Sequence, residues 1–349
     1  MIPLDKSNKN TPVYENYLRV LPFFKDLVYA KKSSISKYWA EEVSGFEYIF
    51  DSSPLIINDL RSHCYHITGE IPYPYRNHHE FRSGQFLQKL KLLRSESQKI
   101  DKDLDLLVSE PEILGGFGFN IEDKFINKDT LKFYECMIAL QKSNAIDANN
   151  KEKKSVICEI GAGWGGFAHC FCTIFPNTKY IISDLPNTLI FSYLFLSEAF
   201  PNKKVKLFNY ESESIEDCDF LLIPNTEFNN YKGTIDGAIN ICSFQEMTSE
   251  QVSEYIETLH GMGSKFIYSL NRNLNKNNLG LKNPISYHIS EKYNLEKIDI
   301  LKIPYTELNL SQTNTSKVNI IKSIIKMLLG IKKDKRVLEN NYQHLIGKL

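Results

Sequence analysis

The stretch VICEIGAGWGGFAHCF, residues 156–171, holds the strongest structural signal in this chain. An apolar run precedes glycines at positions 161, 163 and 166, which match the G-x-G-x-x-G spacing of a strand-to-helix turn. Glycines in such a turn let the backbone approach a ligand closely and aim the N–H groups of the helix at it. Glu159 interrupts the apolar strand shortly before the first glycine, so the ligand has to suit a nearby carboxylate.

Short runs of β-branched and aromatic residues follow along the chain, separated by helical stretches such as 185–200 and 248–261. Together with 155–160, the predicted strands are 178–184, 204–208, 234–241 and 265–270, with 219–225 as an additional candidate. Buried strands that alternate with helices predict a parallel sheet with helices on both faces. The predicted fold class is therefore α/β with a Rossmann-like sheet.

Residues 12–140 show mostly helical periodicity and no alternating β pattern of any length. Breaks rich in proline or glycine interrupt this region at 66–79 and 110–119 and predict loops. The polar segment 143–154 lacks periodicity and indicates a domain boundary. The predicted domains are a helical substrate-binding domain over 1–150, a Rossmann-like domain over 151–310 and a helical extension over 311–349.

The bulk composition excludes several classes of protein. The 42 basic and 42 acidic residues cancel, so no global field attracts the chain to nucleic acid. The seven cysteines are an odd number spread through apolar segments, which is typical of reduced thiols in the cytoplasm. The N-terminal residues do not resemble a secretory signal, and no run of apolar residues is long enough to span a membrane. We therefore expect a cytoplasmic protein.

Two kinds of cofactor suit a glycine turn of this type. A dinucleotide places its diphosphate over the helix N-terminus, where the carboxylate of Glu159 would repel it. S-adenosylmethionine has no phosphate, and its ammonium and sulfonium groups require acceptors and negative charge. It would also provide a partner for Glu159, since an unpaired carboxylate is costly to bury. Asp184, at the end of the next predicted strand, suits the ribose hydroxyls of either cofactor. Glu159 thus favours S-adenosylmethionine.

The segments VICEIGAGWGGFA, YIISDLPNTL and INICSFQEM resemble the bacterial sugar O-methyltransferase family, a branch of the class I S-adenosylmethionine-dependent methyltransferases. The segments SKYWAEE, LRSHCYHITGE and EPEILGGFGF resemble the N-terminal region of that family, so the resemblance covers residues 35–300. It implies a seven-stranded Rossmann-like sheet and methyl transfer to a sugar hydroxyl.

The resemblance also implies a set of cofactor contacts. These are Glu159, Gly161, Gly163, Gly165 and Asp184, to which we add Ala162, Trp164, Leu185, Ser243 and Phe244. Trp164 either stacks near the cofactor or caps the helix face. Two features depart from the family: Cys242 stands where histidine is common, and the strand predicted over 295–304 lacks an evident partner for a closing β-hairpin.

Catalytic candidates follow from the position of CSFQEM, directly after the predicted strand 234–241. Ligands of open α/β sheets lie at the carboxyl ends of strands, so this segment should lie beside the transferred methyl group. A base that removes the proton of a sugar hydroxyl adds a factor of about 10² to 10⁴ in rate. Glu246 is the first candidate for this base; alternatively it caps the helix that begins near residue 248. Gln245 and Ser243 are expected to bind the sugar or the cofactor.

A second set of candidates lies in the helical half, around the loop YPYR. The set comprises the histidines His63, His66, His78 and His79 and the loop residues Tyr73, Tyr75 and Arg76. Histidine exchanges protons near neutral pH, so His66 is the alternative base, although a structural role also fits it. We expect His63, Tyr73, Tyr75, Arg76 and also Arg272 to bind substrate. No oxygen ligands have a recognisable metal-binding spacing, so no metal is assigned.

Residues 316–336 predict a basic amphipathic helix, with seven basic residues and one acid. It lies either on the inner membrane surface or on the sheet with its lysines in solvent. The resulting hypothesis is an enzyme that uses S-adenosylmethionine to methylate a sugar or glycan acceptor of a polysaccharide, glycolipid or nucleotide-sugar precursor. The alternatives are an NAD(P)-dependent oxidoreductase and a noncatalytic S-adenosylmethionine-binding scaffold subunit.

Overall fold

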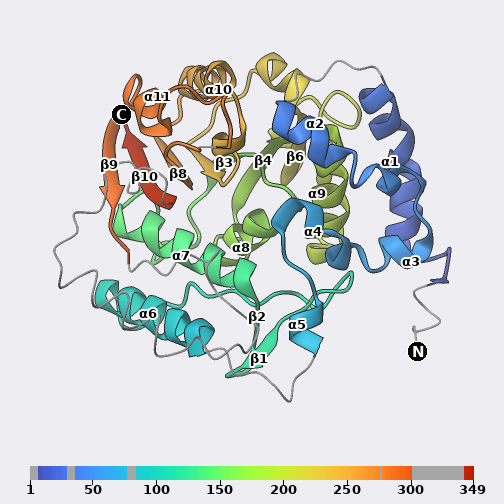
Figure 1. Cartoon of the computed structure of the whole chain (residues 1–349), viewed down its shortest axis with the longest axis horizontal. Helices are drawn as coiled ribbons and strands as arrows, with labels where there is room; N and C mark the ends of the chain where they lie inside the picture. The colour runs from blue at the N-terminus through green and yellow to red at the C-terminus, as the bar shows by residue number, and fades with distance from the viewer. Residues whose placement is uncertain (1–6, 30–35, 77–83, 276, 301–341) are drawn as a thin grey trace.

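The computed structural model describes residues 7–29, 36–76, 84–275, 277–300 and 342–349. Its centre is an eight-stranded sheet with the order β5-β6-β4-β3-β7-β8-β10-β9 (Figure 1). The strands are β3 Ser155–Ile160, β4 Thr178–Asp184, β5 Val205–Leu207, β6 Phe220–Pro224, β7 Gly237–Ile241, β8 Phe266–Arg272, β9 Asn294–Ile298 and β10 Tyr342–Lys348. The first six are mutually parallel, and β10 runs antiparallel to both β8 and β9. The predicted α/β fold and each predicted strand are confirmed, but the sheet has eight strands where the resemblance implied seven.

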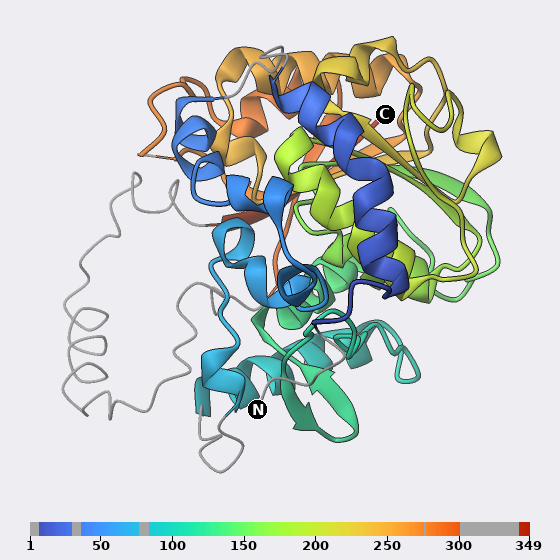
Figure 2. The ribbon, with the colours of Figure 1, turned by 90° about the vertical axis from the view of Figure 1, so that its right-hand side faces the viewer.

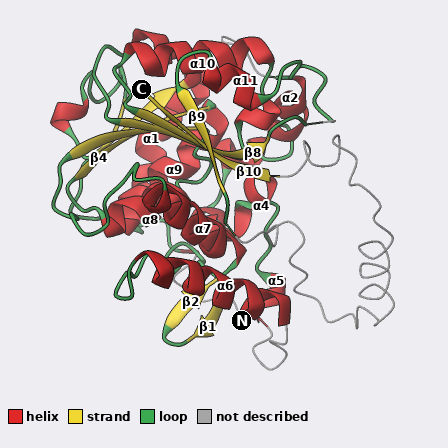
Figure 3. Cartoon of the chain, turned by 90° about the vertical axis from the view of Figure 1, so that its left-hand side faces the viewer, coloured by secondary structure: helices red, strands yellow, loops and turns green. Residues whose placement is uncertain are grey.

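Helices cover both faces of the sheet because successive strand residues point to opposite sides. Ile157 packs with α7 Lys128–Lys142, α8 Gly166–Ile174 and α9 Pro186–Ala199, whereas its neighbour Cys158 packs on the side of α10 Ser249–Gly261 and α11 Ile285–Ser290. Figure 3 shows the two layers of helices on either side of the strands. The central strands are buried on both faces, which explains why their sequences are mostly apolar and do not alternate with polar residues.

The closing antiparallel strand is the main element that the sequence prediction missed. Strand β10 pairs Tyr342 with Arg272 of β8 and Lys348 with Asn294 of β9. The predicted helical extension over 311–349 is therefore wrong for residues 342–348. Strand β9 and its partner are separated by the segment 301–341, so no local hairpin signal links them. The basic helix predicted over 316–336 lies outside the described residues.

The N-terminal region packs against one face and one end of the sheet (Figure 2). Its helices are α1 Pro12–Tyr29, α2 Lys37–Val43, α3 Pro54–Ile57, α4 Tyr65–Thr68, α5 Tyr73–Arg76 and α6 Gly84–Ile100. Helix α1 packs on α9 and α6 packs on α7. A hairpin of β1 Phe119–Ile121 and β2 Lys124–Ile126 lies in the region predicted to lack strands. The larger hydrophobic cluster contains residues from both sides of position 150, and the domain division there stays a prediction.

Candidate functional site

A cavity of about 440 Å³ opens at the carboxyl ends of β3, β4 and β7, where the sheet topology places ligands. Its walls come from the turn after β3, from the segment after β7 and from α2, α4 and α7 of the N-terminal half. The polar groups on these walls include Trp39, Glu42, His66, Lys132, Glu159, Asp184, Asn225, Ser243, Gln245 and Glu246. The N-terminal half and the sheet thus share one site.

The glycine turn has a backbone that residues with side chains rarely adopt. Gly161, Gly163 and Gly165 have φ values of 72°, 61° and 86°. A Cβ atom on Gly161 would lie 2.0 Å from Oγ of Ser243, and one on Gly163 would lie 2.7 Å from Cγ2 of Ile67. The turn therefore touches both the segment after β7 and helix α4. Gly165 is the N-cap of α8.

Glu159 is buried within the sheet at the edge of the cavity, with 1% of its surface exposed. The hydroxyl of Tyr180, on the neighbouring strand β4, donates a hydrogen bond of 3.0 Å to Oε2. Burial raises the pKa of Glu159 to about 8, against the opposing effects of the Tyr180 bond and of the positive charge on Lys132. The carboxyl is therefore poised to ionise when a cationic ligand binds.

Asp184 ends strand β4 and holds the glycine turn. Its Oδ2 accepts a hydrogen bond of 2.7 Å from the N–H of Gly163, and its Oδ1 accepts one of 2.7 Å from the N–H of Leu185. Burial raises the pKa of Asp184 to about 6, although these hydrogen bonds oppose the effect. A carboxylate has about four acceptor positions, so Asp184 can also accept hydrogen bonds from ligand hydroxyls.

Glu246 lines the other end of the site, in the short segment after β7. Its Oε2 accepts a hydrogen bond of 3.0 Å from Nε1 of Trp39, a residue of α2. Burial raises the pKa of Glu246 to about 7, and the negative charge of Glu42 adds to this effect. The alternative in which Glu246 caps α10 is wrong, because the side chain of Thr248 accepts the capping bond from the N–H of Gln251. A carboxyl with this pKa suits a general base near neutral pH.

The structure brings most of the predicted site residues together. Those that line the cavity are Glu159, Gly161, Ala162, Gly163, Trp164, Asp184, Leu185, Ser243, Gln245, Glu246 and His66. Trp164 is buried against Phe133 and Phe195, with ring centroids 6.1 and 4.6 Å away. Predicted cofactor contacts Gly165 and Phe244 do not line the cavity.

The predicted substrate residues of the helical half mostly lie elsewhere. Tyr73 is 70% exposed, whereas Tyr75 is only 2% exposed and donates a hydrogen bond of 3.0 Å to Glu70. Nδ1 of His63 lies 3.1 Å from the hydroxyl of Tyr48. None of the three lines the cavity. Arg76 belongs to α5, but its side chain lies outside the described part of the chain, as do His78 and His79.

Gln245 and Arg272 form part of the framework beneath the cavity. Oε1 of Gln245 accepts a hydrogen bond of 2.9 Å from the N–H of Arg272, and its Nε2 donates one of 3.3 Å to the hydroxyl of Tyr342. The guanidinium of Arg272 lies 5.1 Å from the centre of the Tyr342 ring. Arg272 itself does not line the cavity. These contacts tie β8 and β10 to the segment that carries Glu246.

Sequence reasoning missed several polar residues of the site, among them Lys132, Trp39, Tyr180, Glu42 and Asn225. Lys132 lies on α7, where almost every residue is buried, but the helix also contains Asp129, Glu135 and Gln141, so its sequence does not single out Lys132. Trp39 lies in the segment SKYWAEE, whose only sequence signal is its resemblance to the family and which gives Trp39 no specific role. Tyr180 faces Glu159 because the register of β3 and β4 places them diagonally, which one sequence does not disclose.

Two features of the described residues bear on other functions. No group of three or more histidine, cysteine or acidic side chains in the described ranges could hold a metal ion. Among the helices that the structure describes, each is too short or too polar to cross a bilayer.

No family model matches the chain, and no curated protein matches it in sequence. Among solved structures, it is similar to phosphoethanolamine N-methyltransferase 2 of Haemonchus contortus in complex with S-adenosyl-L-methionine, with 12% identity and a TM-score of 0.35. That match covers 61% of this chain and 51%, or about half, of the other.

Two further solved structures are similar over more of the chain. An O-methyltransferase family protein from Burkholderia thailandensis shares 10% identity over 97% of this chain and 96% of its own, with a TM-score of 0.36. Magnesium protoporphyrin IX methyltransferase from Synechocystis PCC 6803, with bound SAM, shares 10% identity over 80% of this chain and 97% of its own, with a TM-score of 0.36. These TM-scores are too low to assign fold or function, which rest on the sheet topology and on the chemistry of the cavity.

Proposed function

We propose that this chain is an S-adenosylmethionine-dependent methyltransferase. The observation that carries the proposal is a buried carboxyl group and a buried ammonium group that line the same cavity as the glycine turn. Glu159 and Lys132 both line the cavity, and the charge of Lys132 acts directly on Glu159. An α-amino-acid tail has an ammonium and a carboxylate side by side, so it matches both groups at once. A diphosphate would instead meet the two carboxylates of Glu159 and Asp184.

The rest of the cavity also fits a nucleoside. Asp184 lies one strand away from Glu159, at a position where its carboxylate can accept hydrogen bonds from the ribose hydroxyls. Oδ1 of Asn225, at the end of β6, is buried and has no hydrogen-bond partner among the described residues. A buried acceptor of this kind is costly unless a ligand donor satisfies it, and the amino group of adenine is such a donor. Glu159, Lys132, Asp184 and Asn225 are thus the residues that would hold the cofactor.

The reaction follows from the acid at the other end of the site. S-adenosylmethionine would supply a methyl group on a sulfonium; an oxygen nucleophile would attack the methyl carbon in line with the C–S bond, which breaks to release S-adenosylhomocysteine. Glu246 accepts the proton of the acceptor hydroxyl as the new carbon–oxygen bond forms. The indole N–H of Trp39 holds one oxygen of Glu246 in place and favours its ionised form. His66 lines the same cavity and remains the alternative base.

We propose a sugar hydroxyl as the acceptor. The family resemblance supports this choice, and so does the wall around Glu246, where the ring of Trp39 lies beside the carboxyl groups of Glu42 and Glu246. Aromatic faces pack on sugar rings, while carboxylates accept hydrogen bonds from sugar hydroxyls. A surface polysaccharide, a glycolipid or a nucleotide-sugar precursor would each present such a hydroxyl.

Separate titrations with S-adenosylhomocysteine and NADH test the cofactor assignment. We expect saturable calorimetric binding of S-adenosylhomocysteine and none of NADH; tight NADH binding alone would refute the proposal. Transfer of a labelled methyl group from S-adenosylmethionine to cell-envelope glycan extracts then tests the acceptor. Binding of the cofactor without any transfer would favour a noncatalytic scaffold subunit instead.

A further inference from the structure

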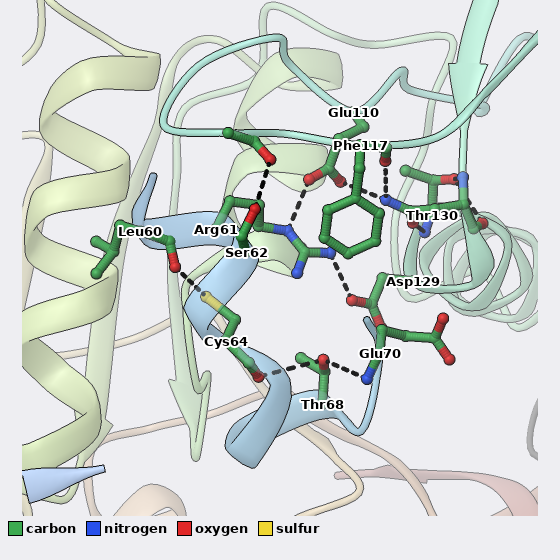
Figure 4. A network of polar contacts seen from close by, with 12 residues as sticks. Leu60, Arg61, Ser62, Cys64, Thr68, Glu70, Glu110, Phe117, Asp129 and Thr130 are labelled. Carbon is green, nitrogen blue, oxygen red and sulfur yellow. Dashed lines mark hydrogen bonds and ion pairs between the residues drawn. The ribbon is translucent and has the colours of Figure 1, made fainter. Parts of the chain in front are cut away.

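A fully buried guanidinium lies behind the cofactor end of the cavity. Arg61, in a short 3-10 helix at Leu60–His63, is 1% exposed. Its Nε donates a hydrogen bond of 2.6 Å to Oε1 of Glu110, and its Nη2 donates one of 2.8 Å to Oδ2 of Asp129 (Figure 4). The guanidinium lies 3.9 Å from the ring centre of Trp164 in the glycine turn and 4.5 Å from that of Phe117. Arg61 therefore contacts Trp164 of the glycine turn, the segment that carries Glu110 and Phe117, and the first turn of α7.

Two sequence segments that the proposed function leaves unexplained meet at this arginine. Arg61 belongs to LRSHCYHITGE and Glu110 to EPEILGGFGF. The backbone N–H of Arg61 also donates a hydrogen bond of 2.8 Å to the carbonyl of Leu114 in the second segment. Neither Arg61 nor Glu110 lines the cavity. Their role is thus exerted through other residues.

Asp129 connects this buried pair to the cavity. Its Oδ2 binds Arg61, and its Oδ1 accepts a hydrogen bond of 3.0 Å from Nζ of Lys132, which lines the cavity. Burial opposes ionisation of Asp129, but the charges of Lys132 and Arg61 hold its pKa below the ordinary value. Burial likewise disfavours the ammonium of Lys132, and the charge of Asp129 offsets it and keeps the pKa raised. Lys132 thus depends on Asp129 for both its place and its charge.

We propose that Arg61 and Asp129 are positioning residues that hold Lys132 for the carboxylate of the cofactor's amino-acid tail. This inference rests on the proposed function. Arg61 fixes the plane of the Asp129 carboxylate, so that Oδ1 faces Lys132 one turn further along α7. An ammonium has three N–H donors, and Lys132 can therefore bind Asp129 and a ligand carboxylate together. Trp164 packs on the same guanidinium and thereby fixes the position of the glycine turn relative to Lys132.

The test compares two ligands that differ only in the tail. S-adenosylhomocysteine has the amino acid, whereas 5′-methylthioadenosine has the nucleoside and a thioether without it. We measure both dissociation constants by calorimetry on the folded full-length protein at pH 8.5. Lys132→Met should weaken S-adenosylhomocysteine binding by about tenfold or more and leave methylthioadenosine binding unchanged, since a charged hydrogen bond of this kind is lost.

The matched pair of variants is Asp129→Asn and Glu110→Gln. Each removes one negative charge and one hydrogen-bond acceptor from the same guanidinium, but only Asp129 contacts Lys132. Asp129→Asn should weaken S-adenosylhomocysteine binding by about tenfold relative to methylthioadenosine. Glu110→Gln should lower the unfolding temperature and leave the ratio of the two affinities within about twofold of the wild-type ratio. Arg61→Lys should act like Asp129→Asn.

The inference would be overturned if Asp129→Asn and Glu110→Gln had the same ratio of S-adenosylhomocysteine affinity to methylthioadenosine affinity. Both residues would then be purely structural. If Asp129→Asn does not fold, the comparison of Arg61→Lys with Glu110→Gln decides in the same way. A wild-type protein that binds neither ligand would refute the proposed function itself, which is a different result from an unchanged ratio.

Discussion

The substitution Glu159→Gln should stabilise the ligand-free protein at alkaline pH while it weakens cofactor binding. Glutamine keeps the shape of the side chain and can still accept the hydrogen bond from Tyr180. What it removes is a carboxyl whose pKa burial raises to about 8, against an ordinary value of 4.5. This difference corresponds to about 5 kcal/mol in the free energy of unfolding, as an upper estimate.

The sign of the effect depends on pH. Below pH 4.5 the Glu159 carboxyl is protonated in both states, so Glu159 and glutamine should be nearly equivalent. Between pH 4.5 and 8 the unfolded chain releases the proton and the folded chain keeps it, which destabilises the wild-type protein as the pH rises. Above pH 8 the full penalty applies. The glutamine variant should therefore become progressively more stable than the wild-type protein as the pH rises from 4.5 to 8.

Chemical denaturation at pH 4.5 and at pH 8.5 measures the effect, with S-adenosylhomocysteine titrations in parallel. The wild-type affinity should rise by up to about tenfold per pH unit below pH 8, because an ammonium ligand requires the ionised carboxylate. The variant should lose this dependence and bind about tenfold or more weakly at pH 8.5. A variant that is less stable than wild type at pH 8.5, or one with unchanged affinity there, would refute the reasoning.

Three further perturbations test other parts of the site. Gly161→Ala should destabilise the protein by about 3 kcal/mol in urea unfolding, since φ is positive and a Cβ would lie 2.0 Å from Oγ of Ser243; a cost below about 0.5 kcal/mol would contradict this geometry. Glu246→Gln should lower methyl transfer by about 10² to 10⁴ and leave S-adenosylhomocysteine affinity unchanged. Wild-type transfer should fall as the pH drops below about 7, the pKa of Glu246, and a flat pH profile would argue against this base. Tyr75→Phe should cost about 1 kcal/mol of stability through the lost bond to Glu70, without any change in acceptor KM.

The outline of the fold could be predicted because its signals are local. The strand before the glycine turn and the strand that ends at Asp184 are rich in β-branched and aromatic residues, and the structure places them where the sequence predicted. Gly161 and Gly163 have positive φ, a local backbone conformation that the presence of glycine at these positions already indicates. The same logic failed for β10, because its partners lie far away along the chain and pairing across that distance leaves no local pattern.

The candidate site divides in a similar way. Glu159, Asp184 and Glu246 could be found from sequence because each lies at, or within a few residues of, the carboxyl end of a strand, and parallel strands bring these ends to one edge. Tyr75 could not be judged correctly, because its burial depends on Glu70 and on the rings of Phe117 and Phe119. An aromatic residue in a proline-rich loop has the same sequence signal whether it faces solvent, as Tyr73 does, or the core, as Tyr75 does.

The sequence by itself determined the Rossmann-like sheet, the glycine turn and the acids that meet at its edge, because hydrophobic periodicity and glycine conformation act within a few residues. Only the tertiary structure decided which other groups face those acids. Lys132 reaches Glu159 through the packing of α7, and Trp39 reaches Glu246 from a helix 207 positions earlier in the chain. Such contacts depend on how separate elements pack in three dimensions, and the electrostatic pairing that defines the ligand arises only once they do.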